Sequence, residues 1–245
     1  MDLHGKVALV TGAGVRVGRA IALELGRAGC DVAVHYRSSA DPARRTAEEI
    51  VAFGRRAVTC RGDLADLATP ERIVGEVRAR LGRLDVLVSS ASSFPKRALA
   101  DSDAGFWEET LRLNLVAPAL LARAAAPAMI EAGGGRIVNL ADILTHRPPR
   151  GYAAYCTSKA GLEGLTRALA IELAPTITVN AIAPGIAQFP DDYDAETKQR
   201  LTERVPLKRP GTPEEVARLV RYLCTEGSYI TGQIIPLDGG LSLRP

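Results

Sequence analysis

Short apolar runs rich in valine, isoleucine and leucine alternate with longer amphipathic segments along the whole chain. Strands of a parallel sheet are buried on both faces and read as apolar runs, whereas the crossover helices carry one apolar stripe. The pattern predicts seven strands, near residues 6–10, 31–35, 56–60, 84–88, 136–140, 177–181 and 233–236. It predicts helices near residues 17–28, 42–53, 69–81, 104–130, 153–173 and 213–224. Pro118 and Pro127 predict a kink or break in the fourth helix.

This alternation indicates the α/β class, as a Rossmann-like, doubly wound parallel sheet of about seven strands. A chain of 245 residues that is 47% hydrophobic can bury one sizeable core, so we expect a single domain over residues 1–245. The segment 184–213 contains five prolines and the acidic patch 191–194, and it is too long for an ordinary connection. We expect it to be a substrate lid; a surface excursion used only in subunit packing is the alternative.

Composition excludes several function classes. The 31 basic and 28 acidic side chains leave a net charge of +3, and no basic run contains interleaved aromatics, so nucleic acid is not an expected partner. We find no leader and no apolar stretch near the roughly 18 residues that span a bilayer, so we expect a cytoplasmic protein without membrane contact. The cysteines at 30, 60, 156 and 224 lack metal-ligand spacing, so we expect small buried side chains and no metal site.

A glycine-containing loop, residues 11–18, follows the first predicted strand and opens a helix. Gly12 and Gly18 permit a tight turn there, and the helix N-terminus offers free N–H groups to a pyrophosphate. An enzyme that uses NAD places a carboxylate about 20 residues later. Here the second strand ends in His35, Tyr36, Arg37 and Ser38. A guanidinium and a hydroxyl suit the extra phosphate of NADP, although a solvated arginine is the alternative.

Tyr155 and Lys159 are four residues apart on a predicted helix, so their side chains share one face. An ammonium group beside a phenol favours the phenolate, and we expect Lys159 to lower the pKa of Tyr155 from its usual value near 10. Tyr155 could then donate a proton near neutral pH. Asp63, after the third strand, either faces an adenine or starts a turn.

With these motifs the chain resembles the classical short-chain dehydrogenase/reductase family over nearly its whole length. The matching pieces are residues 11–18, 62–64, Asn114, Tyr155 with Lys159, Pro184 with Gly185, and 230–240. The resemblance implies that Asn114 holds a helix distortion and a water in a proton relay, and that Lys159 binds the nicotinamide ribose. It also implies a homotetramer and further cofactor contacts, from Arg16, Val17, Asp63, Leu64, Ser90 and Ala91.

The positions at which this chain departs from the general family pattern are more informative than the matches. Arg16 stands where that pattern has the middle glycine of the loop, and residues 89–92 stand where it has Asn-Asn-Ala-Gly. Asp142 replaces the catalytic serine, and Gln188 replaces a threonine. Together with residues 35–38, 91–94 and 151–152 they resemble the pteridine reductases. That resemblance implies that Arg16 and Ser92 contact the cofactor phosphate and the pterin, and that Phe94 stacks on the pterin ring. It also implies that Asp142 and Tyr155 transfer protons. A core position for Phe94 and a turn role for Asp142 are the alternatives.

The sequence therefore predicts an NADPH-dependent reductase that transfers hydride to a pterin-like C=N bond of a dihydropterin or dihydrofolate. The alternative enzyme is a carbonyl reductase of the 3-oxoacyl thioester type, which would need a hydrogen-bond donor where Asp142 stands. A non-catalytic NADP-binding regulator is a third possibility, because fold alone does not establish catalysis. The intact pair of Tyr155 and Lys159 argues against it.

Overall fold

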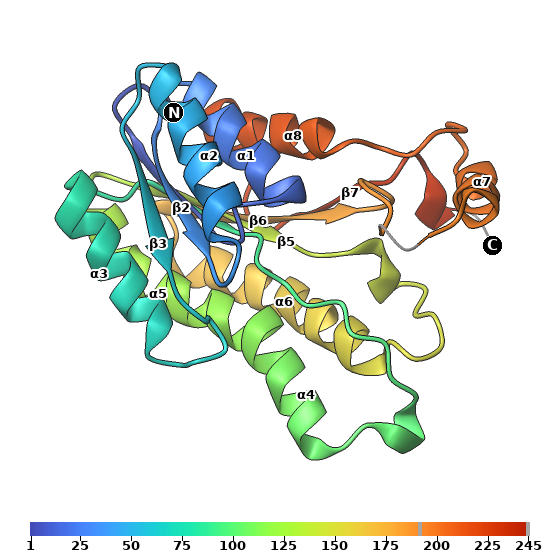
Figure 1. Cartoon of the computed structure of the whole chain (residues 1–245). Helices are drawn as coiled ribbons and strands as arrows, with labels where there is room; N and C mark the ends of the chain where they lie inside the picture. Colours follow the sequence, from blue (N-terminus) through green and yellow to red (C-terminus); the bar gives the residue numbers. More distant parts are fainter. Residues whose placement is uncertain (191–192, 244–245) are drawn as a thin grey trace.

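A computed structural model describes residues 1–190 and 193–243 of the chain. Seven parallel strands form one sheet in the order β3-β2-β1-β4-β5-β6-β7 (Figure 1). The strands are β1 Val7–Val10, β2 Asp31–Tyr36, β3 Ala57–Arg61, β4 Val86–Ser89, β5 Gly135–Leu140, β6 Ile177–Pro184 and β7 Ile234–Leu237. The predicted single-domain doubly wound sheet is confirmed. Its strand order reverses between β1 and β4, and such a switch leaves a crevice at the carboxyl ends of the strands.

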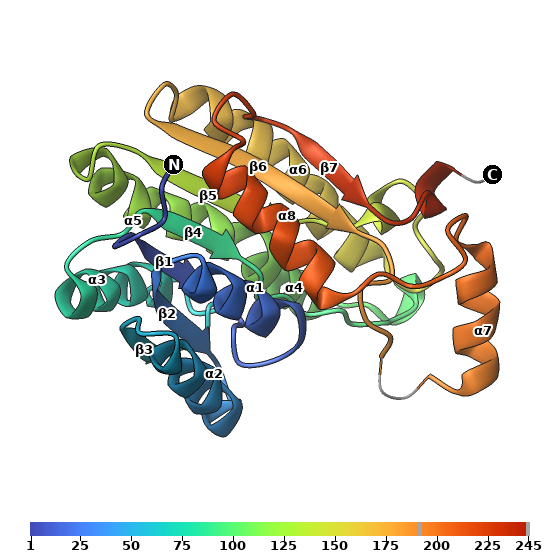
Figure 2. The ribbon, with the colours of Figure 1, turned by 90° about the horizontal axis from the view of Figure 1, so that it is seen from above.

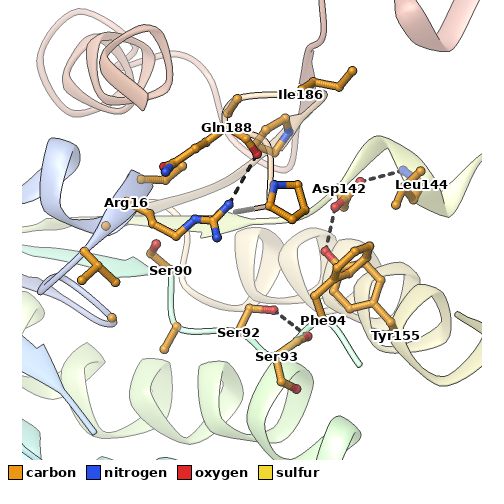
Figure 3. A pocket seen from close by; sticks show the side chains of 18 of the residues that line it. Arg16, Ser90, Ser92, Ser93, Phe94, Asp142, Leu144, Tyr155, Ile186 and Gln188 are labelled. Atoms are coloured by element: carbon orange, nitrogen blue, oxygen red, sulfur yellow. Dashed lines mark hydrogen bonds between the residues drawn. The ribbon is translucent and has the colours of Figure 1, made fainter. Parts of the chain in front are cut away.

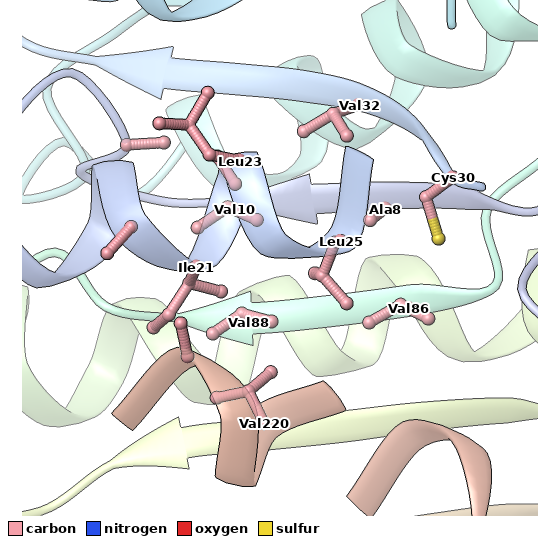
Figure 4. Close-up of a cluster of buried hydrophobic side chains, with 14 of the residues drawn as sticks. Ala8, Val10, Ile21, Leu23, Leu25, Cys30, Val32, Val86, Val88 and Val220 are labelled. Carbon is pink, nitrogen blue, oxygen red and sulfur yellow. The ribbon is translucent and has the colours of Figure 1, made fainter. Parts of the chain in front are cut away.

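Helices cover both faces of the sheet (Figure 2). They are α1 Arg16–Arg27, α2 Ala40–Ala52, α3 Thr69–Leu81, α4 Ala104–Leu111, α5 Ala117–Glu131, α6 Ala153–Glu172, α7 Ala195–Arg204 and α8 Pro213–Thr225. Helices α1, α2 and α8 lie on one face, and α3, α4, α5 and α6 lie on the other. Ile21 of α1, Val88 of β4 and Val220 of α8 are fully buried together in the first of the two cores (Figure 4). This packing fixes the start of α1 at the crevice.

Residues 104–131 form one continuous helical stretch, in which a π-helical turn, Arg112–Val116, joins α4 to α5. The predicted break at the prolines is wrong. Pro118 lies in the first turn of α5, where a missing N–H costs little, and Pro127 lies inside α5 without ending it. The stretch also corrects our expectation about apolar length, since by length and composition it could cross a membrane. Half of its most apolar window is buried in the fold, where α5 packs against α3, β4 and β5.

The segment 184–213 is not wholly irregular, because it contains helix α7. Asp194 caps that helix, and its side chain accepts a hydrogen bond from the Thr197 backbone N–H at 2.7 Å. Asp191 and Asp192, the rest of the predicted acidic patch, lie outside the described residues. Helix α7 lies beyond the carboxyl ends of β6 and β7, away from the two helical layers (Figure 2).

Candidate active site

A cavity of about 1180 Å³ follows the carboxyl ends of the strands from the glycine loop to α7. Most of the predicted site residues line it, namely Gly12, Arg16, Val17, Gly18, His35, Tyr36, Arg37, Ser38, Asp63, Leu64, Ser90, Ala91, Ser92, Phe94, Asp142, Tyr155, Pro184 and Gly185. Lys159 and Asn114 are buried behind its wall. The sequence patterns did not single out the lining residues Leu144, Ile186, Phe189, Tyr193, Leu201 and Arg204. No group of three or more metal-ligating side chains occurs within the described parts of the chain.

The glycine loop between β1 and α1 is held from two sides. A Cβ atom at Gly18 would overlap the carbonyl oxygen of Gly12, so only glycine fits this close approach. His35, at the end of β2, accepts a hydrogen bond from the Gly12 N–H at 3.2 Å. Its other ring nitrogen lies 3.1 Å from the Gly62 carbonyl oxygen. Burial lowers the pKa of His35 to about 4, so the ring is neutral and positions the loop through both nitrogens.

Arg16 occupies the loop position at which the family pattern has its middle glycine. The backbone at Arg16 has a φ of +53°, in the left-handed region that residues other than glycine rarely adopt, which explains why glycine is common at this position. Its guanidinium crosses the cavity and donates to the carbonyl oxygens of Gln188 at 3.4 Å and Phe189 at 3.3 Å (Figure 3). Arg16 therefore links the glycine loop to the segment that follows β6.

At the end of the cavity formed by β2 and β3, Arg37 lies 3.9 Å from Asp63. Both side chains are about half exposed, so the guanidinium is open to a ligand. Asp63 accepts from the Ala65 N–H in a turn and also lines the cavity, and a contact with an adenine stays a prediction. Thr11, which was not predicted as a site residue, accepts hydrogen bonds from the backbone N–H groups of Ser90 and Ala91, both at 2.9 Å. It holds these two residues against the cavity.

Asn114 lies in the π-helical turn between α4 and α5 and is 1% exposed. Its side-chain oxygen accepts from the Ser92 hydroxyl and the Ser93 N–H, both at 3.0 Å. Its amide nitrogen donates to the Ser93 carbonyl and to the Ser158 hydroxyl, again at 3.0 Å. The amide thus ties the segment after β4 to α6, so Asn114 shapes the cavity wall from behind.

The centre of the site is a tyrosine hydrogen-bonded to a carboxylate. The Tyr155 hydroxyl on α6 donates to Asp142 Oδ2 at 2.7 Å, and Asp142 Oδ1 accepts from the Leu144 N–H at 2.8 Å (Figure 3). Burial raises the pKa of Asp142 above its usual range, although the hydrogen bond from Tyr155 opposes this. Burial and the neighbouring carboxylate raise the pKa of Tyr155 well above 10. Asp142 also caps the short helical turn that follows it, so the turn role is observed, and its role in proton transfer stays a prediction.

Lys159 is 3% exposed, and its Nζ donates to the Leu140 carbonyl oxygen at 2.7 Å. It lies 5.8 Å from the centroid of the Tyr155 ring. Burial lowers the pKa of Lys159 to about 8. The prediction that Lys159 lowers the pKa of Tyr155 is therefore wrong for this arrangement, because desolvation and the nearby Asp142 outweigh a buried ammonium that bonds elsewhere.

An aromatic wall adjoins the Tyr155–Asp142 pair. Phe94 stacks on Tyr152 with ring centroids 4.4 Å apart and meets Tyr155 edge-on at 4.6 Å. Phe94 is 45% exposed and lines the cavity, so it is not a core residue. Arg147, which the sequence patterns did not single out, lines the cavity too. A flat, partly polar ligand would meet apolar ring surface and a carboxyl group side by side.

Comparisons with known proteins agree with this architecture. The family model described as Enoyl-(Acyl carrier protein) reductase matches residues 12–242. The 3-oxoacyl-(acyl-carrier-protein) reductase FabG of Aquifex aeolicus is 38% identical, over 98% of this chain and 99% of that protein. The crystal structure of acetoin dehydrogenase YohF from Salmonella typhimurium superposes with a TM-score of 0.91 at 38% identity, covering 98% and 97% of the two chains. A blue fluorescent protein from a metagenomic library, crystallised with NADPH, gives 0.92 at 34% identity, covering 98% and 99%. The chain belongs to the classical short-chain dehydrogenase/reductase family, and it is an oxidoreductase of that family.

Proposed function

We propose that this protein is an NADPH-dependent reductase of pterin-like C=N bonds, in dihydropterins or dihydrofolate. One observation carries the proposal: the Tyr155 hydroxyl donates to a partly buried carboxylate, Asp142, beside the aromatic wall of Phe94. A carboxyl group can pair with the amidine-like edge of a pterin ring, which a serine hydroxyl cannot do as well. A cytoplasmic homotetramer stays a prediction, as does closure of the segment 184–213 over the substrate.

The residues present fit NADP(H). The N-terminus of α1 and the cradle at Gly18, where any side chain would overlap Gly12, suit a pyrophosphate. Arg37 and Ser38 at the end of β2 suit the 2′-phosphate, and no acidic side chain lies at the end of that strand to repel it. Lys159 and Tyr155 would hold the nicotinamide ribose by family resemblance. When bound, the cofactor supplies the hydride.

The chain's own groups supply and position the proton. Addition of hydride to the carbon of a C=N bond must be matched by a proton at the nitrogen. Because burial raises the pKa of Asp142, its protonated form is more populated near neutral pH than that of an ordinary aspartate, and it can donate. Tyr155 orients the carboxyl group through its hydroxyl.

A second candidate, reduction of a ketone in a 3-oxoacyl thioester or a small hydroxyketone, is favoured by the similarity to FabG and to an acetoin dehydrogenase. It requires a donor to the ketone oxygen. Here the Tyr155 hydroxyl is engaged by Asp142, so the ketone would have to displace that bond or use the protonated carboxyl.

The direct test is a spectrophotometric panel that follows NADPH consumption with dihydropterin, dihydrofolate, acetoin and a 3-oxoacyl thioester. The proposal expects saturable reduction of the pterin-type compounds with a kcat/KM at least about tenfold above that of either ketone. Turnover of ketones alone would establish the second candidate, and turnover of nothing would favour a non-catalytic role. Tyr155→Phe serves as the control that any measured activity belongs to this site.

A further inference from the structure

The described residues that line the cavity carry more positive than negative charge. Four arginines and two aspartates line the cavity among the described residues. Arg37 pairs with Asp63 at the far end, and Arg16 donates only to backbone carbonyl groups. The remaining cations are Arg147 and Arg204.

These two arginines come from different elements that border the cavity. Arg147 follows the short helical turn after β5, in the same segment as Asp142 and Leu144. Arg204 is the last residue of α7, and it shares the cavity-facing side of that helix with Leu201. Within the described ranges, neither guanidinium has a hydrogen bond or an ion pair.

Several exposed arginines are held by carboxylates, such as Arg209 by Glu215 at 2.7 Å and Arg123 by Glu71 at 2.9 Å. Other arginines also lack a partner among the described residues, but of these only Arg147 and Arg204 line the large cavity. The described acids near α7, namely Asp194, Glu196 and Glu203, do not line the cavity. The remaining cavity acid, Asp142, is partly buried, and its two oxygens already accept from the Tyr155 hydroxyl and the Leu144 N–H.

We propose that Arg147 and Arg204 form an anion subsite, and that the natural substrate carries a carboxylate or phosphate group on a tail extending from the reacting ring or thioester. The inference rests on the proposed function for the identity of the ring, but the charge argument is independent of it. Two guanidinium groups that line one cavity suit a carboxylate or phosphate, since both offer paired oxygens to arginine. Leu201, which lines the same cavity, would supply apolar contact for the linking part of the tail.

The test compares substrates that differ only in the anion. Dihydrofolate is paired with its diamide, and the acetoacetyl thioester of 4′-phosphopantetheine is paired with that of neutral pantetheine. We expect the wild-type enzyme to show a KM at least about tenfold lower for the anionic member of the pair that it reduces. Added salt should raise the KM of that member alone, because ionic screening weakens exposed charge pairs. The pair that is turned over tells whether the anion is a carboxylate tail or a phosphate.

Two variants test whether the lower KM for the anionic substrate depends on Arg147 and Arg204. Arg147→Gln and Arg204→Gln should each raise the KM for the anionic member about three- to tenfold, leave its kcat within about twofold, and leave the neutral member unchanged. Arg150→Gln and Arg200→Gln are matched controls, because each lies on the same segment within four residues but does not line the cavity. Equal KM values within each pair, or no loss in the two variants, would overturn the subsite while leaving pterin reduction intact. Reduction of the thioester pair alone would overturn the proposed function. The KM values of the two thioesters, and their changes in the variants, would then decide whether the subsite exists. Failure to turn over either pair overturns both.

Discussion

The Tyr155 hydroxyl and Asp142 Oδ2 lie 2.7 Å apart, so the expected proton donor of this reductase is already bonded to a buried carboxyl group. Burial raises the pKa of both groups, and the hydrogen bond between them favours a neutral tyrosine beside whichever form of Asp142 is present. The two groups therefore titrate as a coupled pair. The consequence is that the carboxyl group, rather than a phenolate, becomes the group whose protonation state varies.

Tyr155→Phe tests this coupling. The change retains the ring that packs edge-on against Phe94 but removes the hydroxyl, so turnover should fall by roughly 10²- to 10⁴-fold with little change in NADPH affinity. The hydrogen bond from Tyr155 lowers the pKa of Asp142, so its removal should raise that pKa further. Carbon-13 NMR of the Asp142 carboxyl group measures the shift. Wild-type turnover in the variant, or a lowered carboxyl pKa, contradicts this assignment.

The sequence predicted the sheet well because buried parallel strands leave an apolar pattern that depends on local neighbours. All seven predicted strands occur, with ends that differ by up to three residues. Helix α7 was missed because its hydrophilic sequence, residues 195–204, carries no apolar stripe and buries no residue. Its cap at Asp194 was the available signal, but the surrounding prolines outweighed it.

The sequence predicted which residues belong to the site better than it predicted how those residues contact one another. Resemblance to the pteridine reductases indicated that Tyr155, Asp142 and Phe94 share one site, and all three line the same cavity. The link from Arg16 to Gln188 and Phe189 joins residues more than 170 positions apart and has no local signature. The direction of the Tyr155 pKa was missed because it depends on burial and on where Lys159 donates its hydrogen bond, and spacing reports neither.

Arg37→Ala tests the choice of cofactor. The guanidinium is 60% exposed and only loosely paired with Asp63, so it is available to the 2′-phosphate that distinguishes NADPH from NADH. The dissociation constant for NADPH should rise about 10- to 100-fold, whereas that for NADH should change less than about threefold. Titration calorimetry on both cofactors measures this, with Arg44→Ala as an exposed control outside the cavity. A parallel loss for both cofactors contradicts a role at the phosphate.

Replacement of Arg16 tests the left-handed backbone at the glycine loop. Arg16→Gly and Arg16→Ala both remove the guanidinium, but only glycine adopts a φ of +53° without steric cost. We expect the glycine variant to have the larger free energy of unfolding, by about 1 kcal/mol, which reverses the usual order of these residues in a helix. Urea unfolding of both variants measures the difference. A more stable alanine variant would indicate that the loop relaxes to a right-handed conformation.

The buried His35 predicts a dependence of stability on pH. The unfolded chain takes up a proton below a pH of about 6.5, whereas burial lowers the folded pKa to about 4. The free energy of unfolding should therefore fall as the pH drops through this window, by about 3 kcal/mol at most. His35→Gln should lose that part of the slope, and His146→Gln, at an exposed position, should retain it. Urea unfolding at pH 7.5 and 4.5 gives the comparison, and identical slopes in wild type and His35→Gln would assign the acid sensitivity to other groups.

Asp142→Ser is the sharpest test of the pterin assignment. The serine restores the hydroxyl that the general family pattern has at this position, but it removes the carboxyl group that accepts from Tyr155 and faces the cavity. If that carboxyl group protonates a pterin ring or pairs with it, pterin reduction should fall by on the order of 10²-fold or more, with NADPH affinity nearly unchanged.

Asp142→Asn provides the matched control, because it can still accept from Tyr155 and from the Leu144 N–H but cannot transfer a proton. Losses of similar size in both variants point to proton transfer, and a smaller loss in the asparagine variant points to positioning. Stopped-flow measurement of NADPH oxidation with saturating dihydropterin separates the chemical step from product release. If Asp142→Ser reduces dihydropterin as fast as wild type, the carboxyl group has no part in the reaction, and the carbonyl reductase alternative becomes the better account of this site.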